Sequence, residues 1–163
     1  MQASNFDIDR DDYRLAYVCM TDLEQYDHVH ATRRTFIDDL GDTQASMIEN
    51  DDKTDIYLLY YKGRPVSTAR IHQKEQGYKI ERVATKSSEQ KKGLGRVLME
   101  LMHEVVYARC QPGQLVYLHA ETHAVPFYLK VGYYVVGEAF IEDEVIEHYK
   151  MIHSRSKPKE DAQ

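Results

Sequence analysis

The chain has 163 residues, of which 42% are hydrophobic and 29% charged, and this size and composition fit one globular domain. A formal net charge of −6 argues against nucleic acid as a partner, because proteins that bind nucleic acid carry a basic surface. The longest apolar run, residues 56–61, is far shorter than the roughly 20 residues that cross a membrane. No secretory signal is visible at the start, so we expect a cytoplasmic protein without membrane or nucleic-acid partners.

Charge is distributed unevenly along the chain, and cysteines are few. Residues 1–55 carry 14 acidic and 5 basic side chains, whereas residues 56–163 carry 13 acidic and 16 basic ones, which indicates two differently charged surfaces. Cys19 and Cys110 are too few for a disulfide framework, so we expect two buried free thiols. Residues 156–163 lack apolar side chains that could dock them, which predicts a single domain over 1–155 followed by a flexible tail.

The first half of the chain predicts a strand, a helix and then three more strands. Residues 13–20 are rich in β-forming side chains, and Thr21 with Glu24 matches a capping box at the start of a helix that Gly41 would end. Residues 42–55 are acidic and irregular, with a short helical turn at 45–49. An antiparallel meander follows, because short turns separate the apolar segments 56–62, 66–72 and 78–85.

The second half predicts a long helix, a strand, a short helix and a final strand pair. An apolar stripe at helical spacing marks the long helix, with Leu94, Val97, Leu98, Leu101, Met102 and Val105. Thr122 would cap the short helix, Pro126 would lie in its first turn and Gly132 would end it. The strands are 115–121, 133–141 and 146–154. This order predicts a mixed α/β (α+β) domain with one mostly antiparallel sheet of about six to seven strands flanked by helices.

A glycine loop between the meander and the long helix is the clearest local motif. Gly93 and Gly95 let the backbone approach a ligand closely, and the first N–H groups of the following helix are unpaired and carry partial positive charge. Cationic side chains surround it, namely Lys86, Lys91, Lys92 and Arg96. The loop therefore indicates a phosphate or pyrophosphate site, although a glycine turn that merely starts a helix remains the alternative. Its spacing fits neither a P-loop nor a Rossmann loop.

The segment Gln90-x-x-Gly93-x-Gly95 is similar to the Q/R-x-x-G-x-G/A element of the GNAT superfamily of N-acetyltransferases. Residues 127–133, Phe-Tyr-Leu-Lys-Val-Gly-Tyr, resemble the segment on that superfamily's last helix. More narrowly, residues 79–84, 118–124 and 142–148 resemble the bacterial ElaA-type branch, and the likeness runs from about residue 13 to 153.

This resemblance implies a GNAT-like domain that uses acetyl-coenzyme A (acetyl-CoA) as co-substrate, without a metal. Loop residues would hold the pyrophosphate, namely Gln90, Lys91, Lys92, Gly93, Leu94, Gly95 and Arg96. The main chain of Val83, Ala84 and Thr85 would pair with the pantetheine arm. The acetyl group would pass directly to a primary amine of a small molecule or protein in a ternary complex. The resemblance also allows a homodimer.

The same resemblance implies catalytic roles. Tyr128 matches the helix tyrosine beside the coenzyme sulfur and would act as general acid; the alternative is that it packs in the core as one of 13 tyrosines. Glu81 is the candidate base, and on a regular strand it would share a face with Val83 and Thr85. A structural ion pair with Arg82, Arg70 or a lysine is the alternative for Glu81. The rival bases are His119, His123 and His148.

Several polar residues are expected on the acceptor side, namely His119, Glu121, His123, Glu142 and His148. If the strand continued through residue 123, the first three could bind a metal ion, but a helix cap at Thr122 would break that alternation. The acidic stretch 38–55 would attract a cationic amine or form a solvated loop. One alternative to acetylation is a sensor that binds the coenzyme without turnover. Another is an acyltransferase with a longer acyl donor, because the front end of the chain also resembles acyl-homoserine-lactone synthases.

Overall fold

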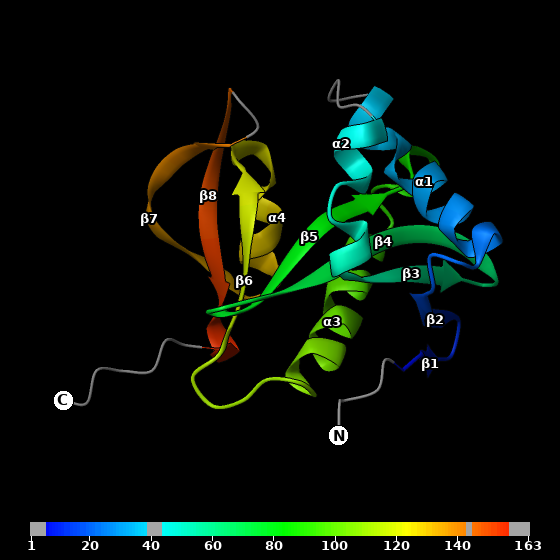
Figure 1. Cartoon of the computed structure of the whole chain (residues 1–163), viewed down its shortest axis with the longest axis horizontal. Coiled ribbons are helices and arrows are strands. Elements are labelled where there is room, and N and C mark those ends of the chain that lie inside the picture. The colour runs from blue at the N-terminus through cyan, green and yellow to red at the C-terminus, as the bar shows by residue number, and fades with distance from the viewer. Residues whose placement is uncertain (1–5, 39–43, 143–144, 157–163) are drawn as a thin grey trace.

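The computed structural model describes residues 6–38, 44–142 and 145–156, and these residues form one sheet with helices on both faces (Figure 1). Among them, eight strands are ordered β1-β2-β3-β4-β5-β6-β8-β7. The strands span Ile8–Arg10 (β1), Tyr13–Val18 (β2), Asp55–Tyr61 (β3), Arg64–Lys74 (β4), Gly77–Thr85 (β5), Leu115–Glu121 (β6), Tyr133–Glu142 (β7) and Ile146–His153 (β8). The α-helices span Leu23–Asp38 (α1), Gln44–Ile48 (α2), Leu94–Tyr107 (α3) and Val125–Lys130 (α4). The predicted fold class is confirmed, with one strand more than expected.

The additional strand is β1, which pairs antiparallel with β2 through a tight turn. Asp11 adopts a left-handed conformation in that turn, with φ of 49°. Because β1 is three residues long, it has too few positions to show the alternation that marks a strand. The prediction that Gly41 ends the first helix lies outside the described residues.

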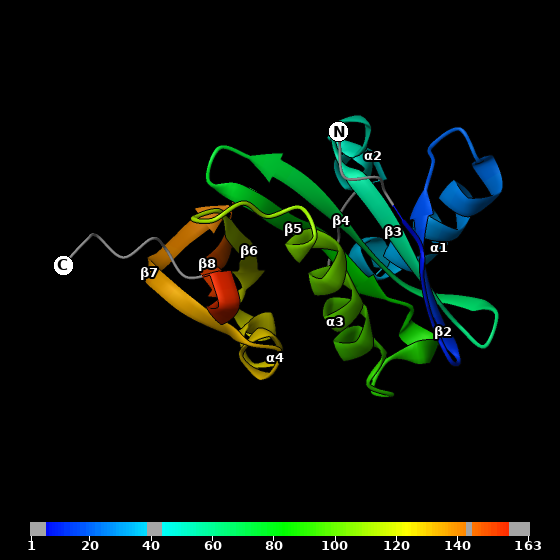
Figure 2. The same cartoon turned by 90° about the horizontal axis from the view of Figure 1, so that it is seen from below.

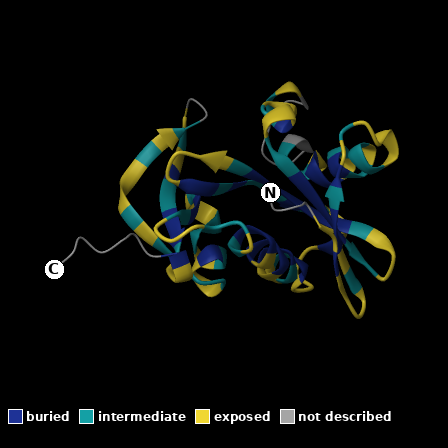
Figure 3. Ribbon diagram, turned by 60° about the horizontal axis from the view of Figure 1, so that its bottom comes forward, coloured by how far each residue is buried: buried dark blue, intermediate teal, exposed yellow. Residues whose placement is uncertain are grey.

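The helices cover the two faces of the sheet (Figures 1 and 2), and each face has its own apolar cluster. On the α1 face, Val29 packs with Val18, Ile56 and Leu58. On the opposite face, α3 buries the predicted stripe except for Val97, which is half-buried, and α4 adds Tyr128 to the same cluster. Figure 3 shows the result: the central strands are buried, whereas the outer strand β7 is mostly exposed or half-buried. In the described part of the chain, no helix is long and apolar enough to cross a bilayer.

Three local predictions at the helix starts and at Cys19 are wrong. The backbone N–H of Gln25 donates to Asp22 Oδ1 at 3.2 Å, so Asp22 rather than Thr21 caps α1. The Thr21 hydroxyl instead lies 2.9 Å from the sulfur of Cys19, which is exposed and not buried. Thr122 does not cap α4, because a 3₁₀ turn, Thr122–Ala124 (η3), precedes the helix, and the Thr122 hydroxyl instead donates a hydrogen bond to Glu147. Pro126 lies in the first turn of α4, as predicted.

The predicted tail begins one residue too early. Ser156 is buried, and its hydroxyl accepts a hydrogen bond from the N–H of Val116 at 2.9 Å. It also donates to the carbonyl of His153 at 2.9 Å, so it closes the end of β8. The other tail residues, 157–163, lie outside the described residues. Ser156 therefore belongs to the fold.

Cys110, predicted to be buried, is half-buried.

The parallel pair β5 and β6 joins the two parts of the sheet over a very short stretch. Gly77–Lys79 lie opposite Leu115–Tyr117, and beyond them the strands diverge (Figure 1). Gly77 lies where the strands meet, with φ of 146°, and a Cβ there would be 2.1 Å from the carbonyl oxygen of Leu115. Glycine is needed at this close approach. Where the strands diverge, residues of both β5 and β6 line a cleft.

Candidate active site

A β-bulge in β5 shapes one side of this cleft. Thr68 pairs with Ala84 and Arg70 with Glu81, so two residues of β5, Arg82 and Val83, oppose a single residue of β4. Arg82 takes a left-handed conformation, with φ of 52°, as bulges often require. The bulge breaks the alternation: Glu81 faces Arg70 on one side of the sheet, whereas Val83 packs against the α3 cluster on the other. The predicted common face of Glu81, Val83 and Thr85 is therefore wrong.

Two cavities lie along the cleft. The polar cavity, about 400 Å³, lies between β4 and β5 on one side and β6 and β8 on the other. The loop cavity, about 510 Å³, lies between the end of β5, the loop before α3, and α4. Four residues line both cavities, namely Val83, His123, Ala124 and Tyr128. The two spaces therefore meet beside Tyr128.

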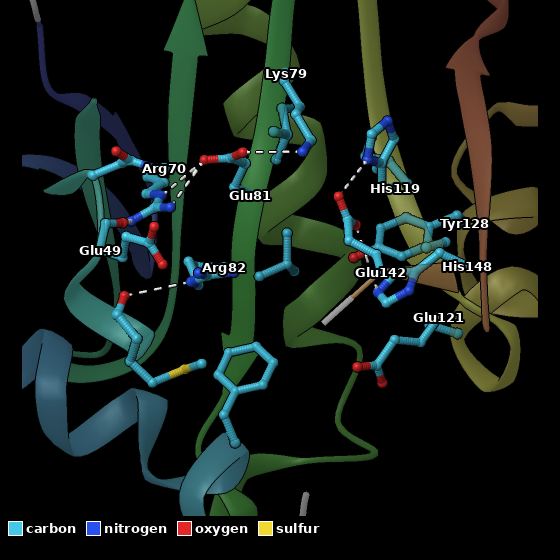
Figure 4. Close-up of a pocket in the computed structure, with 18 of the residues that line it drawn as sticks. Glu49, Arg70, Lys79, Glu81, Arg82, His119, Glu121, Tyr128, Glu142 and His148 are labelled. Carbon is cyan, nitrogen blue, oxygen red and sulfur yellow. Dashed lines mark hydrogen bonds and ion pairs between the residues drawn. The ribbon is translucent and has the colours of Figure 1, made fainter. Parts of the chain in front are cut away.

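The β4–β5 wall of the polar cavity is an extended ion-pair network. Glu81 Oε1 lies 3.0 Å from Arg70 Nε, and its Oε2 lies 3.2 Å from Lys79 Nζ (Figure 4). Glu81 Oε1 also lies 3.3 Å from His72 Nδ1. Behind it, the buried Asp51 binds both Arg70 and Arg33 at 2.8 Å. Asp51 belongs to the acidic stretch 38–55, but it is only 1% exposed, so it fits neither the attraction of an amine nor the solvated loop considered for that stretch.

Arginine side chains also hold the segment that closes this wall. Arg70 donates to the carbonyl of Glu49 at 2.6 Å, and Arg82 donates to the carbonyl of Ser46 at 3.1 Å. Both carbonyls belong to residues that line the polar cavity. A buried guanidinium has five donors and satisfies backbone and carboxylate acceptors together. The network therefore fixes the shape of the cavity wall.

The opposite wall, from β6, β7 and β8, is formed by histidines and carboxylates (Figure 4). His119 Nδ1 lies 3.1 Å from Glu142 Oε1, and His148 Nε2 lies 3.8 Å from Glu142 Oε2. His148 is 4% exposed, and its Nδ1 lies 2.9 Å from the carbonyl oxygen of Ile146. The pKa of His119 is lowered mainly by burial and next by the positive charge of Lys79, while the hydrogen bond to Glu142 raises it by less. Glu121 completes this wall, close to Tyr128.

The loop before α3 has the conformation that an anion site needs. Gly93 occupies the N-cap position with φ of 77°, and no side chain caps the helix there. A Cβ on Gly93 would meet nothing within 4 Å, whereas one on Gly95 would lie 3.3 Å from Phe127 Cζ. Gln90 anchors the loop by donating to the carbonyl of Thr85 at 3.2 Å. The open first turn of α3 therefore faces the loop cavity.

Glu89 neutralises part of the loop's positive charge. Its carboxylate binds Arg64 at 2.9 Å and Lys92 at 3.1 Å. Hydrogen bonds from these two cations lower the pKa of Glu89 to about 2, so it stays ionised. Arg96 is likewise paired, with Glu100 at 3.2 Å. Two of the four predicted cations are thus engaged by carboxylates, Lys92 by Glu89 before the loop and Arg96 by Glu100 on α3.

Tyr128 has the surroundings of a proton donor. It is 9% exposed, and burial, followed by the nearby charge of Glu121, raises the pKa of its hydroxyl well above 10. The hydroxyl therefore keeps its proton at neutral pH. Behind it, Tyr133 packs edge-to-face at 5.8 Å and donates or accepts a 2.7 Å hydrogen bond with His103 Nε2.

The cavities bring most of the predicted site residues together. The polar cavity is lined by the predicted base and acceptor-side residues, Glu81, His119, Glu121, His123, Glu142 and His148. The loop cavity is lined by the predicted coenzyme residues Val83, Ala84, Thr85, Gln90, Lys91, Gly93, Leu94, Gly95 and Arg96, while Lys92 is turned to Glu89. The sequence analysis missed Arg33 and Asp51, and it named Arg70 only as a possible ion-pair partner of Glu81. The sequence did contain one signal: Arg70 lies within the apolar segment 66–72, and a buried arginine is almost always paired with a carboxylate.

The possible metal ligands are not brought together. The strand β6 ends at Glu121, so η3 turns His123 out of the alternation, and its side chain is 67% exposed. Its Nδ1 lies 3.4 Å from Glu121, away from the pair formed by His119 and Glu142. Over residues 6–38, 44–142 and 145–156, no three His, Cys, Asp or Glu side chains are grouped to hold a metal ion.

Comparison with known proteins identifies the family. Residues 20–154 match the family described as "Acetyltransferase (GNAT) domain". The uncharacterized N-acetyltransferase YjcF of Bacillus subtilis is 29% identical over 113 residues, which cover 69% of this chain and 77% of YjcF. Escherichia coli ElaA has the same fold, with a TM-score of 0.71 and 21% identity over 87% of this chain and 99% of ElaA. A Bacillus subtilis acetyltransferase solved in complex with CoA aligns with a TM-score of 0.61 and 16% identity over 86% and 97% of the two chains. The chain, which matches this family over most of its length, is a member of the GNAT acetyltransferases.

Proposed function

We propose that the protein transfers an acetyl group from acetyl-CoA to a primary amine in a ternary complex. The observation that carries this proposal is the position of Tyr128, which lines both the loop cavity and the polar cavity and keeps a protonated hydroxyl between them. A thioester lying in the loop cavity and an amine lying in the polar cavity would meet at this residue.

The loop cavity fits the phosphates and the pantetheine arm of acetyl-CoA. The uncapped first turn of α3 offers N–H groups and partial positive charge, and the left-handed Gly93 leaves room for close approach. Beyond Lys79, the edge of β5 diverges from β6, so the main chain of Val83–Thr85 is placed to pair with an extended ligand. Acetyl-CoA or CoA is bound in several structures of the same fold, among them the Bacillus subtilis enzyme.

The transfer requires one new bond and one broken bond. The amine nitrogen attacks the thioester carbonyl carbon, the C–N bond forms, and the C–S bond breaks with its electron pair left on sulfur. Tyr128 would give its proton to that thiolate and regain one from the protonated nitrogen of the product through solvent. A neutral phenol in a buried site suits this role, because a charged phenolate there would be costly.

Isothermal titration of acetyl-CoA tests the first half of the proposal. We expect wild-type protein to bind it, and Gly93→Asp to abolish binding by placing a carboxylate where phosphate would lie. Gly137→Asp is the matched control, because Gly137 has nearly the same φ, 74° against 77°, and equal free space at Cβ but lies on β7. Equal binding by wild type and Gly93→Asp would place the coenzyme elsewhere. Release of CoA thiol with a panel of amines tests turnover, and binding without release would favour a sensor.

A further inference from the structure

The proton that the acceptor amine must lose has no good acceptor on the β4–β5 wall. Glu81 is surrounded by Arg70, Lys79 and His72, all within 3.3 Å of its oxygens. Burial alone would raise the pKa of Glu81, but Lys79 and Arg70 outweigh it, so the pKa lies below its ordinary value. A carboxylate engaged by three donors and made less basic is poorly suited to accept a proton. Glu81 fits the structural ion pair that was its alternative role.

The opposite wall offers a histidine whose free nitrogen is defined by its hydrogen bonds. His148 Nδ1 lies 2.9 Å from the carbonyl oxygen of Ile146. A carbonyl can only accept a hydrogen bond, so Nδ1 carries the hydrogen and the lone pair of the neutral ring is on Nε2. Nε2 faces Glu142 Oε2 at 3.8 Å, a distance too long for a hydrogen bond but short for a charge interaction. An Nε2 without a hydrogen is a base.

Glu142 is held beside this nitrogen by His119. The carboxylate can only accept, so His119 Nδ1 donates to Glu142 Oε1 across 3.1 Å. The ring of Phe140 lies edge-on to His119 at 4.9 Å and stacks on His148 at 6.0 Å, which keeps the two histidines apart. Glu121 lies directly opposite His148 in the β6–β8 ladder. Glu142 therefore lies beside the nitrogen where a positive charge would form, and Glu121 lines the same cavity, so both carboxylates would also attract an ammonium group.

This inference rests on the proposed function and names its missing proton acceptor. We infer that His148 Nε2 takes the proton from the ammonium form of the acceptor, that Glu142 stabilises the resulting imidazolium, and that His119 positions Glu142. The N–H bond of the ammonium breaks, its electron pair stays on nitrogen for attack on the thioester, and the proton later leaves His148 for solvent. Together with proton donation by Tyr128, the reaction releases one proton for each amine acetylated.

The tautomer of His148 can be read without any substrate. In protein labelled with ¹⁵N-histidine, long-range ¹H–¹⁵N correlations distinguish a ring that carries its hydrogen on Nδ1 from one that carries it on Nε2. We expect the neutral His148 ring to carry it on Nδ1. A hydrogen on Nε2 would overturn the inference, because no lone pair would then face the cavity.

Kinetics test the role in turnover. With the best acceptor from a panel of ethanolamine, cadaverine, tyramine and L-lysine amide, we expect His148→Gln to lower kcat about 100-fold or more. The acid-side fall of the pH profile should flatten, while acetyl-CoA affinity is unchanged. The titratable groups nearest His148 are Glu121, Glu142 and His119, and Tyr128 and Lys79 line the same cavity. Glu142→Gln should lower kcat about tenfold, and His28→Gln, the same change on α1, should leave it unchanged.

The possible failures can be told apart. An active wild type whose rate and pH profile survive in His148→Gln would overturn the inference and leave the proposed function intact. A wild type that binds acetyl-CoA but acetylates no amine would contradict the proposed function itself. If His148→Gln fails to fold by circular dichroism, the tautomer in the wild-type protein and the kinetics of Glu142→Gln still decide the question.

Discussion

Tyr128 combines two properties that single residues seldom combine: it is buried, and it lies at the meeting point of two cavities. Burial keeps the phenol neutral, and the junction would give that neutral donor access to both proposed reactants. Its motif identified it in the sequence, but the motif alone could not distinguish it from a tyrosine packed in the core. The distinction depends on how α4 meets the diverging ends of β5 and β6.

We expect Tyr128→Phe to lower kcat by about 10²-fold or more, because a phenol is lost where the thiolate leaves. The affinity for acetyl-CoA should change little, since the ring is retained. Steady-state kinetics with thiol release, together with titration calorimetry, separates the two quantities. Tyr134→Phe is the matched change on β7, and equal losses in both variants would contradict the assigned role.

At the scale of secondary-structure elements, α3 packs on β7 and β8 through an aromatic cluster that the proposed chemistry does not use. The rings of His103 and His153 lie 4.1 Å apart, and His153 Nδ1 is 2.5 Å from the Tyr107 hydroxyl. Burial, the neighbouring His153 and Arg155 together lower the pKa of His103 to about 3. The helix is thus joined to the end of the sheet by neutral imidazoles.

This cluster predicts a loss of stability in acid. The unfolded chain protonates His103 near pH 6.5, whereas the folded chain resists protonation until about pH 3, so stability falls as pH drops through this interval. Between pH 7 and 5, this group alone costs about 2 kcal/mol. Urea unfolding at both pH values measures it, and His103→Gln should reduce the difference by up to that amount. A wild-type midpoint equal at pH 7 and 5 would contradict the prediction.

The elements that were predicted and those that were missed differ in a physical way. The stripe on α3 and the meander 56–85 follow from periodicity, which a single chain displays. The bulge at Arg82 and the short strand β1 do not, because each is fixed by its partner strand. The bulge matters most, since it turns Glu81 toward Arg70 and leaves Val83 beside Tyr128. Loop residues were found because their motif is local, whereas the buried partners of Asp51 come from α1 and β4, far apart in sequence.

On the scale of the whole molecule, the sheet consists of two parts joined by the short β5–β6 ladder, and the proposed ligand site spans both parts. A ligand that binds only the folded protein stabilises it by mass action. At a concentration 100-fold above Kd this contributes about 2.7 kcal/mol, which corresponds to a rise in Tm of roughly 5–10 °C for a domain of this size.

We therefore expect acetyl-CoA to raise the Tm of the wild type by that amount in differential scanning calorimetry. Gly93→Asp should show no rise, and Gly137→Asp should behave as the wild type. A rise of equal size in all three proteins would show that the ligand binds outside the loop cavity.

The apex of the cleft carries a consequence for protein engineering. Gly77 lines neither cavity, yet a Cβ at this position would overlap the backbone of Leu115. Any larger residue would therefore push β5 and β6 apart where they meet and change the width of the cleft beyond that point. Mutant libraries that vary only cavity-lining positions would omit Gly77, although a substitution there would alter the spacing of the two strands that carry the opposite walls of the polar cavity.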